Sequence, residues 1–90
     1  MTELDLLLNE ITEELERARS KFPKSRATMV ALMEEVGELA KAMMDESAEN
    51  VRNEAIQVAV MAIRTALDGD RSLDILRDDH GLDPVGTPAF

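Results

Sequence analysis

The residues most able to do chemistry are the glutamates of the segment Glu34-Glu35-Val36-Gly37-Glu38. On a helix, residues three or four apart project from the same face, so Glu38 would lie beside both Glu34 and Glu35. Carboxylates packed this closely repel one another unless a cation neutralises them. By itself, however, the segment is also typical of the solvated face of an acidic helix.

A second polar pair, Glu54 and Gln57, begins the most apolar stretch of the chain. Gln57 is the only polar residue between positions 55 and 63, and polar groups in such a setting are costly unless they have partners. If this segment folds back antiparallel on the first, Glu38 lies near Glu54, and the other two glutamates lie near Gln57. Four carboxylates and an amide oxygen would converge, a set of hard oxygen ligands that suits Mg²⁺, with Mn²⁺ as a substitute.

The elements that must position these residues are predicted to be helices, because apolar residues recur at helical spacing and period-2 alternation is absent. The expected helices span about residues 3–21, 26–46 and 48–67, with a short fourth from 70 or 72 to about 79. Their candidate N-caps are Thr2, then Ser25, then Ser47 or Asn50. Residues 81–90 are predicted to form a tail with little regular structure, which leaves residues 1–80 as one helical domain.

The composition indicates that this domain completes its core with a second subunit. The chain has 90 residues and no cysteine, so its core is thin and no disulfide can reinforce it. The helix expected over residues 48–67 is apolar on nearly every face, and two other helices of one subunit can hardly cover it. We therefore expect an all-α fold in which a helical hairpin completes a four-helix-bundle-like core by dimerisation, as a homodimer or homotetramer.

The charge and hydropathy of the chain limit the classes of partner that it can bind. With 19 acidic and 10 basic residues the net charge is −9, which repels nucleic acid polymers and makes divalent cations necessary for binding a polyphosphate. The only histidine is His80, so a zinc site built on histidine and cysteine is excluded. The chain has no apolar run of membrane-spanning length, so we expect no membrane partner and a cytoplasmic location.

The two motifs together resemble a known family. Glu34-Glu35-Val36-Gly37-Glu38, followed after the spacer of residues 39–53 by Glu54-Ala55-Ile56-Gln57, is similar to the E-E-x-x-E, spacer, E-x-x-D pattern of the MazG-like, all-α nucleoside triphosphate pyrophosphohydrolases. The resemblance covers roughly residues 22–70 and looks closest to a short, phage-associated branch. It implies a helical dimer or tetramer that uses Mg²⁺ to cleave a (d)NTP or related nucleotide between the α and β phosphates, releasing a monophosphate and pyrophosphate.

The resemblance also implies roles for individual residues. Glu35, Glu38 and Glu54 match the metal ligands of the family. Glu34 matches the further glutamate that supports the site or orients the attacking water, so Glu34 and Glu35 are the candidate catalytic residues. Gln57 stands where the family usually has aspartate, and its amide oxygen can still ligate Mg²⁺ although it brings no negative charge.

Few residues are available to contact the rest of a nucleotide. Arg64 lies on the stripe of Glu54 and Gln57, and Lys41 follows Glu38 by one turn, so both are candidate phosphate contacts. Phe22 is the candidate base-stacking residue, although such a residue also commonly caps a core.

Two other functions compete with catalysis. The chain can be a non-catalytic MazG-like helical oligomer that binds a nucleotide or a protein partner, an interpretation favoured by Gln57. It can also be a purely structural helical oligomer whose glutamates form a solvated face.

Overall fold

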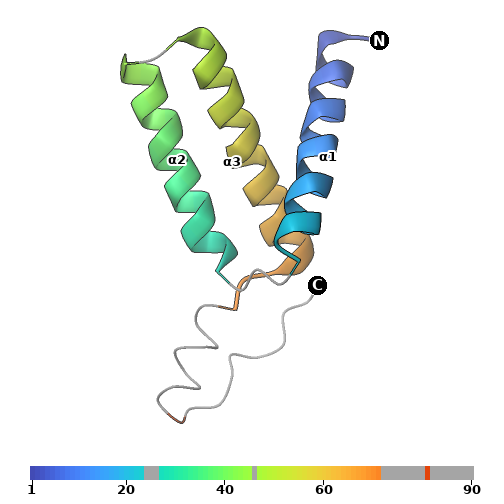
Figure 1. Cartoon of the computed structure of the whole chain (residues 1–90), viewed down its shortest axis with the longest axis vertical. Coiled ribbons are helices and arrows are strands. Elements are labelled where there is room, and N and C mark those ends of the chain that lie inside the picture. The colour runs from blue at the N-terminus through green and yellow to red at the C-terminus, as the bar shows by residue number, and fades with distance from the viewer. Residues whose placement is uncertain (24–26, 46, 72–80, 82–90) are drawn as a thin grey trace.

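The chain folds into α-helices, as the apolar periodicity predicted. The computed structural model describes residues 1–23, 27–45, 47–71 and 81, and these form three helices and no strand. They are α1 (Glu3–Lys21), α2 (Thr28–Asp45) and α3 (Ala48–Asp68), shown in Figure 1. The first and third have nearly the expected bounds, whereas α2 begins two residues later than expected. The proposed cap Ser25, most of the expected fourth helix and nearly all of the expected tail lie outside the described residues.

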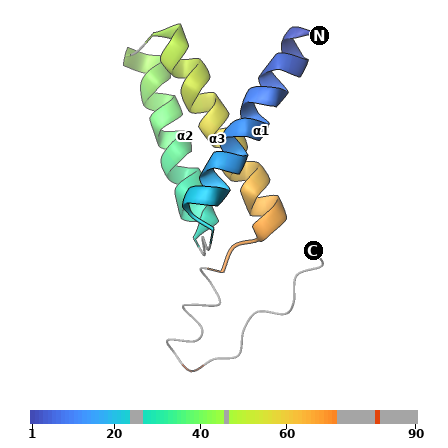
Figure 2. The ribbon, with the colours of Figure 1, turned by 45° about the vertical axis from the view of Figure 1, so that its right-hand side comes forward.

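The three helices are arranged with α3 in the middle. The helices α2 and α3 form the expected antiparallel hairpin, and α1 lies on the other side of α3 (Figure 1). Packing is most extensive between α2 and α3, and α1 contacts α3 far more than α2. Figure 2 shows that α1 leans away from the hairpin toward its N-terminus. This arrangement leaves a groove between α1 and α2, with α3 at its floor.

The helix ends follow from local side-chain chemistry. Thr2 and Asp5 form a reciprocal capping box at the start of α1, because the Thr2 Oγ1 accepts from the Asp5 amide at 3.1 Å and the Asp5 carboxylate accepts from the Thr2 amide at 3.0 Å. Of the two candidates at α3, Ser47 is the N-cap, since its hydroxyl accepts from the Asn50 amide at 3.2 Å. Gly69 ends α3 with a φ of 74°, a conformation that favours glycine.

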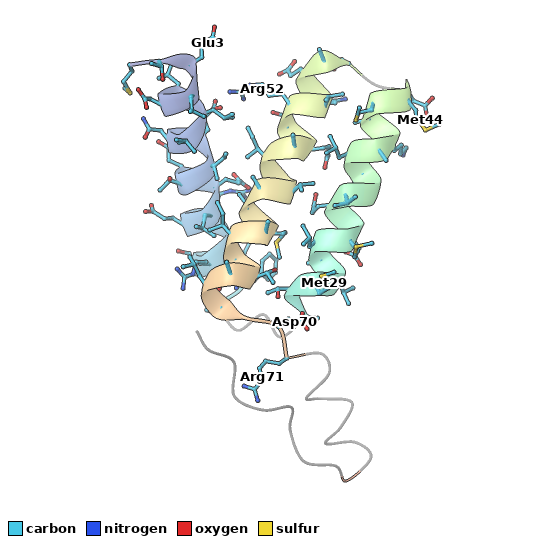
Figure 3. All side chains as sticks on the ribbon, turned by 180° about the vertical axis from the view of Figure 1, so that it is seen from behind. Glu3, Met29, Met44, Arg52, Asp70 and Arg71 are labelled. Atoms are coloured by element: carbon cyan, nitrogen blue, oxygen red, sulfur yellow. The ribbon has the colours of Figure 1, made fainter. Side chains whose placement is uncertain are left out.

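The start of α2 is closed by the segment that follows α3. The Asp70 carboxylate accepts from the backbone amide of Met29 at 2.7 Å, and the buried Thr28 hydroxyl donates to the Gly69 carbonyl at 2.9 Å. Figure 3 shows Asp70 beside Met29 at this end of the bundle. An orphan amide of the first turn thereby gains an acceptor whose negative charge also suits the helix dipole. These contacts join the two ends of the hairpin.

The C-terminal end of α1 is held by one buried cation. Only 2% of Arg64 is exposed, and its guanidinium donates to the Ala18 carbonyl at 3.2 Å and to the Phe22 carbonyl. Its Nε also donates to the Asp68 carboxylate at 3.2 Å. The Ala18 carbonyl, which also accepts from the Phe22 amide, and the Phe22 carbonyl just beyond α1 therefore both accept from a side chain of α3.

The core of the described chain is small. Its buried apolar residues are Ile11, Ala42 and Val60, whereas many large apolar side chains are more than one-third exposed. None of the helices in the described part of the chain combines the length and apolar character needed to cross a bilayer. The exposed apolar side chains of the hairpin include Met29, Val30, Met33, Val36, Met43, Met44, Ile63 and Leu67.

Candidate functional site

The hairpin brings together one glutamate from each of its helices. Glu35 of α2 and Glu54 of α3 are both half-buried, and their carboxyl groups approach within hydrogen-bonding reach of each other. Two carboxyl groups can share a hydrogen bond only when one of them holds a proton. Glu34 and Glu38 are exposed and contribute negative charge around Glu35. The structure thus places the predicted glutamates in one electrostatic neighbourhood, with Glu35 at its centre.

The surroundings of Glu35 disfavour its charged form. Loss of water around the carboxyl group raises the pKa of Glu35, and the negative charge and hydrogen bond of Glu54 raise this pKa further. Glu38 and Glu34 add smaller contributions in the same direction. A divalent cation at this position would favour the charged form of Glu35, because repulsion between the carboxylates would be replaced by attraction of each carboxylate to the ion.

Gln57 forms a hydrogen bond with Glu14, a residue that sequence reasoning did not single out. Its Nε2 donates to Glu14 Oε1 of α1 at 3.0 Å, and Glu14 also accepts two hydrogen bonds from Arg17, through Nε at 3.2 Å and through Nη2. The bond from Arg17 and then the bond from Gln57 lower the pKa of Glu14, against a smaller effect of burial. The signal for Glu14 lay in its position, because it shares the inner stripe of α1 with the apolar Ile11 and Ala18.

A cavity of about 590 Å³ opens in the groove between α1 and the hairpin. This volume is within the range of small-molecule sites, roughly 300–1,000 Å³. Glu35 and Gln57 line the cavity, and so does the predicted base-stacking residue, Phe22. Phe22 is 59% exposed, and the Lys21 ammonium lies 5.6 Å from the centre of its ring. Glu35, one member of the carboxylate pair, and an aromatic side chain therefore line the same cavity.

The cations near this cavity differ from those expected. Arg64 lines it, but its guanidinium is engaged with the carbonyls at the end of α1 and with Asp68, so a phosphate contact would require it to leave these partners. Lys41 is exposed on α2 and is not among the residues that line the cavity. Arg17 and Lys21, which lie one turn apart on α1, line it instead. Sequence reasoning missed both, because the position of α1 against the hairpin was unknown.

The carboxylates of this site provide few ligands for a metal ion. Within the described part of the chain, no three acidic or histidine side chains are placed to hold an ion together. The closely spaced pair of Glu35 and Glu54 nevertheless suits Mg²⁺, which is commonly bound by one or two carboxylates together with waters and substrate phosphates. Glu38 and Gln57, the other ligands expected from the sequence, each lie one helical turn from one member of this pair. The donor set therefore fits an ion whose coordination is completed by phosphate oxygens.

Comparison of the chain with protein-family models, with curated proteins and with solved structures found no match in any of the three. The resemblance to the MazG-like pattern therefore rests on the residues of the paired motif alone.

Proposed function

We propose that the protein is a Mg²⁺-dependent nucleotide pyrophosphohydrolase that cleaves a (d)NTP or related nucleotide between the α and β phosphates. The observation that carries the proposal is the close approach of Glu35 and Glu54 across the hairpin beside a cavity of ligand size. Two half-buried carboxyl groups in contact are unfavourable unless a proton or a cation accompanies them. The spacing of the paired motif supports a cation and a polyphosphate as the natural occupants.

The roles of the residues follow from their positions. Glu35 and Glu54 would hold the ion, and Glu38 and Gln57 would complete its protein ligands. Bound Mg²⁺ would neutralise phosphate oxygens and acidify a water molecule so that it can act as a nucleophile at neutral pH. Glu34 is exposed beside this cluster and is the residue that we propose to orient the water and accept its proton.

The proposal is tested by incubating the chain with a panel of canonical and modified NTPs in Mg²⁺ or Mn²⁺ and measuring pyrophosphate and monophosphate. We expect release of pyrophosphate, and we expect Glu38→Ala to abolish it. Glu16→Ala is the matched control, because Glu16 is an exposed glutamate on α1. Release of orthophosphate alone, or turnover of no substrate, would count against the enzyme.

A second function is favoured by the hydrogen bond between Gln57 and Glu14. This position lacks the charge that the resembled motif usually supplies, so the scaffold can bind a nucleotide or a protein partner without catalysis. Metal-dependent nucleotide binding in equilibrium dialysis, combined with no turnover, would establish this alternative.

We further propose that the protein works as a homodimer, in the cytosol, with its hairpins packed back to back. The apolar residues on the outer side of α2 recur at alternating spacings of four and three, the repeat that packs one helix against another. Gly37 lies beside this stripe and faces open space in the subunit. The stripe, which we call the outer stripe of α2, consists of Met29, Met33, Val36, Ala40 and Met43.

A further inference from the structure

The hydrogen bond between α1 and α3 fixes which way the amide of Gln57 points. Its partner is the Glu14 carboxylate, 3.0 Å from Nε2, and an ionised carboxylate can only accept hydrogen bonds. The amide nitrogen must therefore face Glu14. Arg17 donates to the same carboxylate through Nε and Nη2, so that Glu14 is itself held in place.

This orientation leaves one atom of Gln57 for the cavity. Gln57 and Glu35 both line the cavity, and with Nε2 directed at Glu14 the free end of the amide is Oε1. We propose that Glu14 is a positioning residue that holds Gln57 with Oε1 toward the pair of Glu35 and Glu54, so that Gln57 acts as a neutral oxygen ligand of the divalent cation. The inference rests on the metal centre of the proposed function.

The same geometry accounts for an amide at position 57. A carboxylate there would face Glu14 on one side and the pair of Glu35 and Glu54 on the other, and like charges at such separations repel. An amide avoids this conflict because it donates to Glu14 from one end and offers an oxygen from the other. Gln57, which replaces the aspartate of the resembled motif, is therefore matched to Glu14 on α1.

The test measures binding of Mn²⁺ alone to the whole chain, from the electron paramagnetic resonance signal of the free ion. We expect Glu14→Gln to weaken binding about tenfold, because a glutamine can either donate or accept and no longer fixes the amide, and loss of such supporting contacts typically costs roughly 10–100-fold in metal affinity. Glu13→Gln is the matched control, since Glu13 is exposed on the same helix and its loss changes the net charge equally. We expect the control to bind as the wild type does.

An exchanged pair makes the test specific to the hydrogen bond. In E14Q/Q57E the total charge of the two positions is unchanged, and the glutamine at position 14 can donate to the carboxylate at position 57. We expect Mn²⁺ affinity to return at least to the wild-type value. Circular dichroism and a thermal melt without Mn²⁺ show whether each variant keeps the fold.

Three results would overturn the inference, in two distinguishable ways. Wild-type affinity in Glu14→Gln, or no recovery in the exchanged pair, would remove the positioning role. The metal centre would still stand if Glu35→Gln abolished Mn²⁺ binding in the same assay. If Glu35→Gln bound Mn²⁺ as the wild type does, the metal centre and the proposed function would fail together.

Discussion

Glu35 and Glu14 face one cavity from two helices, and their surroundings move their pKa values in opposite directions. Burial and neighbouring carboxylates raise the pKa of Glu35, whereas donors from Arg17 and Gln57 lower the pKa of Glu14. Glu14 is therefore a fixed anion that orients its neighbours. Glu35 is a group whose charge is costly until a cation approaches. This division is the residue-level reason for which we propose a divalent cation at Glu35 and a supporting contact at Glu14.

The first prediction concerns the pH dependence of stability. Because the folded-state pKa of Glu35 lies above the ordinary value of 4.5, the folded chain binds more protons than the unfolded chain between these two pKa values. The free energy of unfolding therefore loses a contribution as pH rises through this window. Glu35→Gln has no carboxyl group to titrate, so it does not lose this contribution. The free energy of unfolding of the variant should therefore rise relative to that of the wild type as pH increases from about 4. The difference should become constant above the raised pKa.

The measurement for Glu35 is urea unfolding at a series of pH values, without divalent ions and at fixed protein concentration. Glu16→Gln is the control for removal of one exposed carboxylate. Saturating Mg²⁺ at neutral pH should stabilise the wild type and not Glu35→Gln, because only the wild type retains the ligand. A stability difference between Glu35→Gln and wild type that stays the same at every pH would contradict the assigned surroundings of Glu35.

Sequence reasoning reached some of these residues and missed others for a physical reason. The convergence of glutamates across a hairpin followed from helical periodicity and a short connection, because both are local properties of the chain. The expected neighbour of Glu54 was Glu38, however, and it is Glu35 that interacts with Glu54, because the register of α2 against α3 depends on side-chain packing. The roles of Glu14 and Arg64 depend on the angle at which α1 crosses α3, which no local pattern specifies. Arg64 was placed on the correct helix, but its engagement with the Phe22 carbonyl could not be predicted without that angle.

At the scale of the elements, the ends of the helices are joined by a few polar contacts. The amide of Met29 near the start of α2 has its acceptor, Asp70, in the segment after α3. Asp70→Ala should lower the free energy of unfolding by about 1 kcal/mol, the usual effect of losing a capping side chain. Asp70→Asn keeps an oxygen acceptor and should lose less. Urea unfolding checks this, and Asp45→Ala, at the opposite end of α2, should have little effect.

Loss of the Arg64 side chain should lower the free energy of unfolding more than loss of the Asp70 side chain. Arg64→Met removes a buried donor and leaves the carbonyls of Ala18 and Phe22 without it, which should cost about 3 kcal/mol. Arg52→Met is the matched control, because Arg52 forms an ion pair with Glu10 in which both side chains are about half exposed. Such pairs contribute less than about 1 kcal/mol. Equal losses in the two variants would show that Arg64 does not hold the end of α1.

At the scale of the whole molecule, the unequal packing of the helices defines two sides. The cavity, which Glu14, Glu35 and Gln57 help to line, lies in the groove between α1 and the hairpin. The outer stripe of α2 is exposed in the subunit, with 57% of Met33 and 69% of Met43 accessible. Burial of apolar surface is the main favourable term in association, so this side is the one from which a second copy would gain most. Assembly and the proposed chemistry then use different surfaces of one hairpin.

The last prediction tests that separation. Met33→Glu places a charge in the middle of the outer stripe of α2, where a partner helix would have to bury it, so the variant should sediment as a monomer at concentrations that keep the wild type dimeric. The thermal midpoint of the wild type should rise with protein concentration, because dissociation is linked to unfolding, and that of Met33→Glu should not. Leu6→Glu is the matched control, since Leu6 is 51% exposed on α1 and lies outside the stripe. A monomeric wild type, or a Met33→Glu variant that remains dimeric, would show that the outer stripe of α2 does not form the interface.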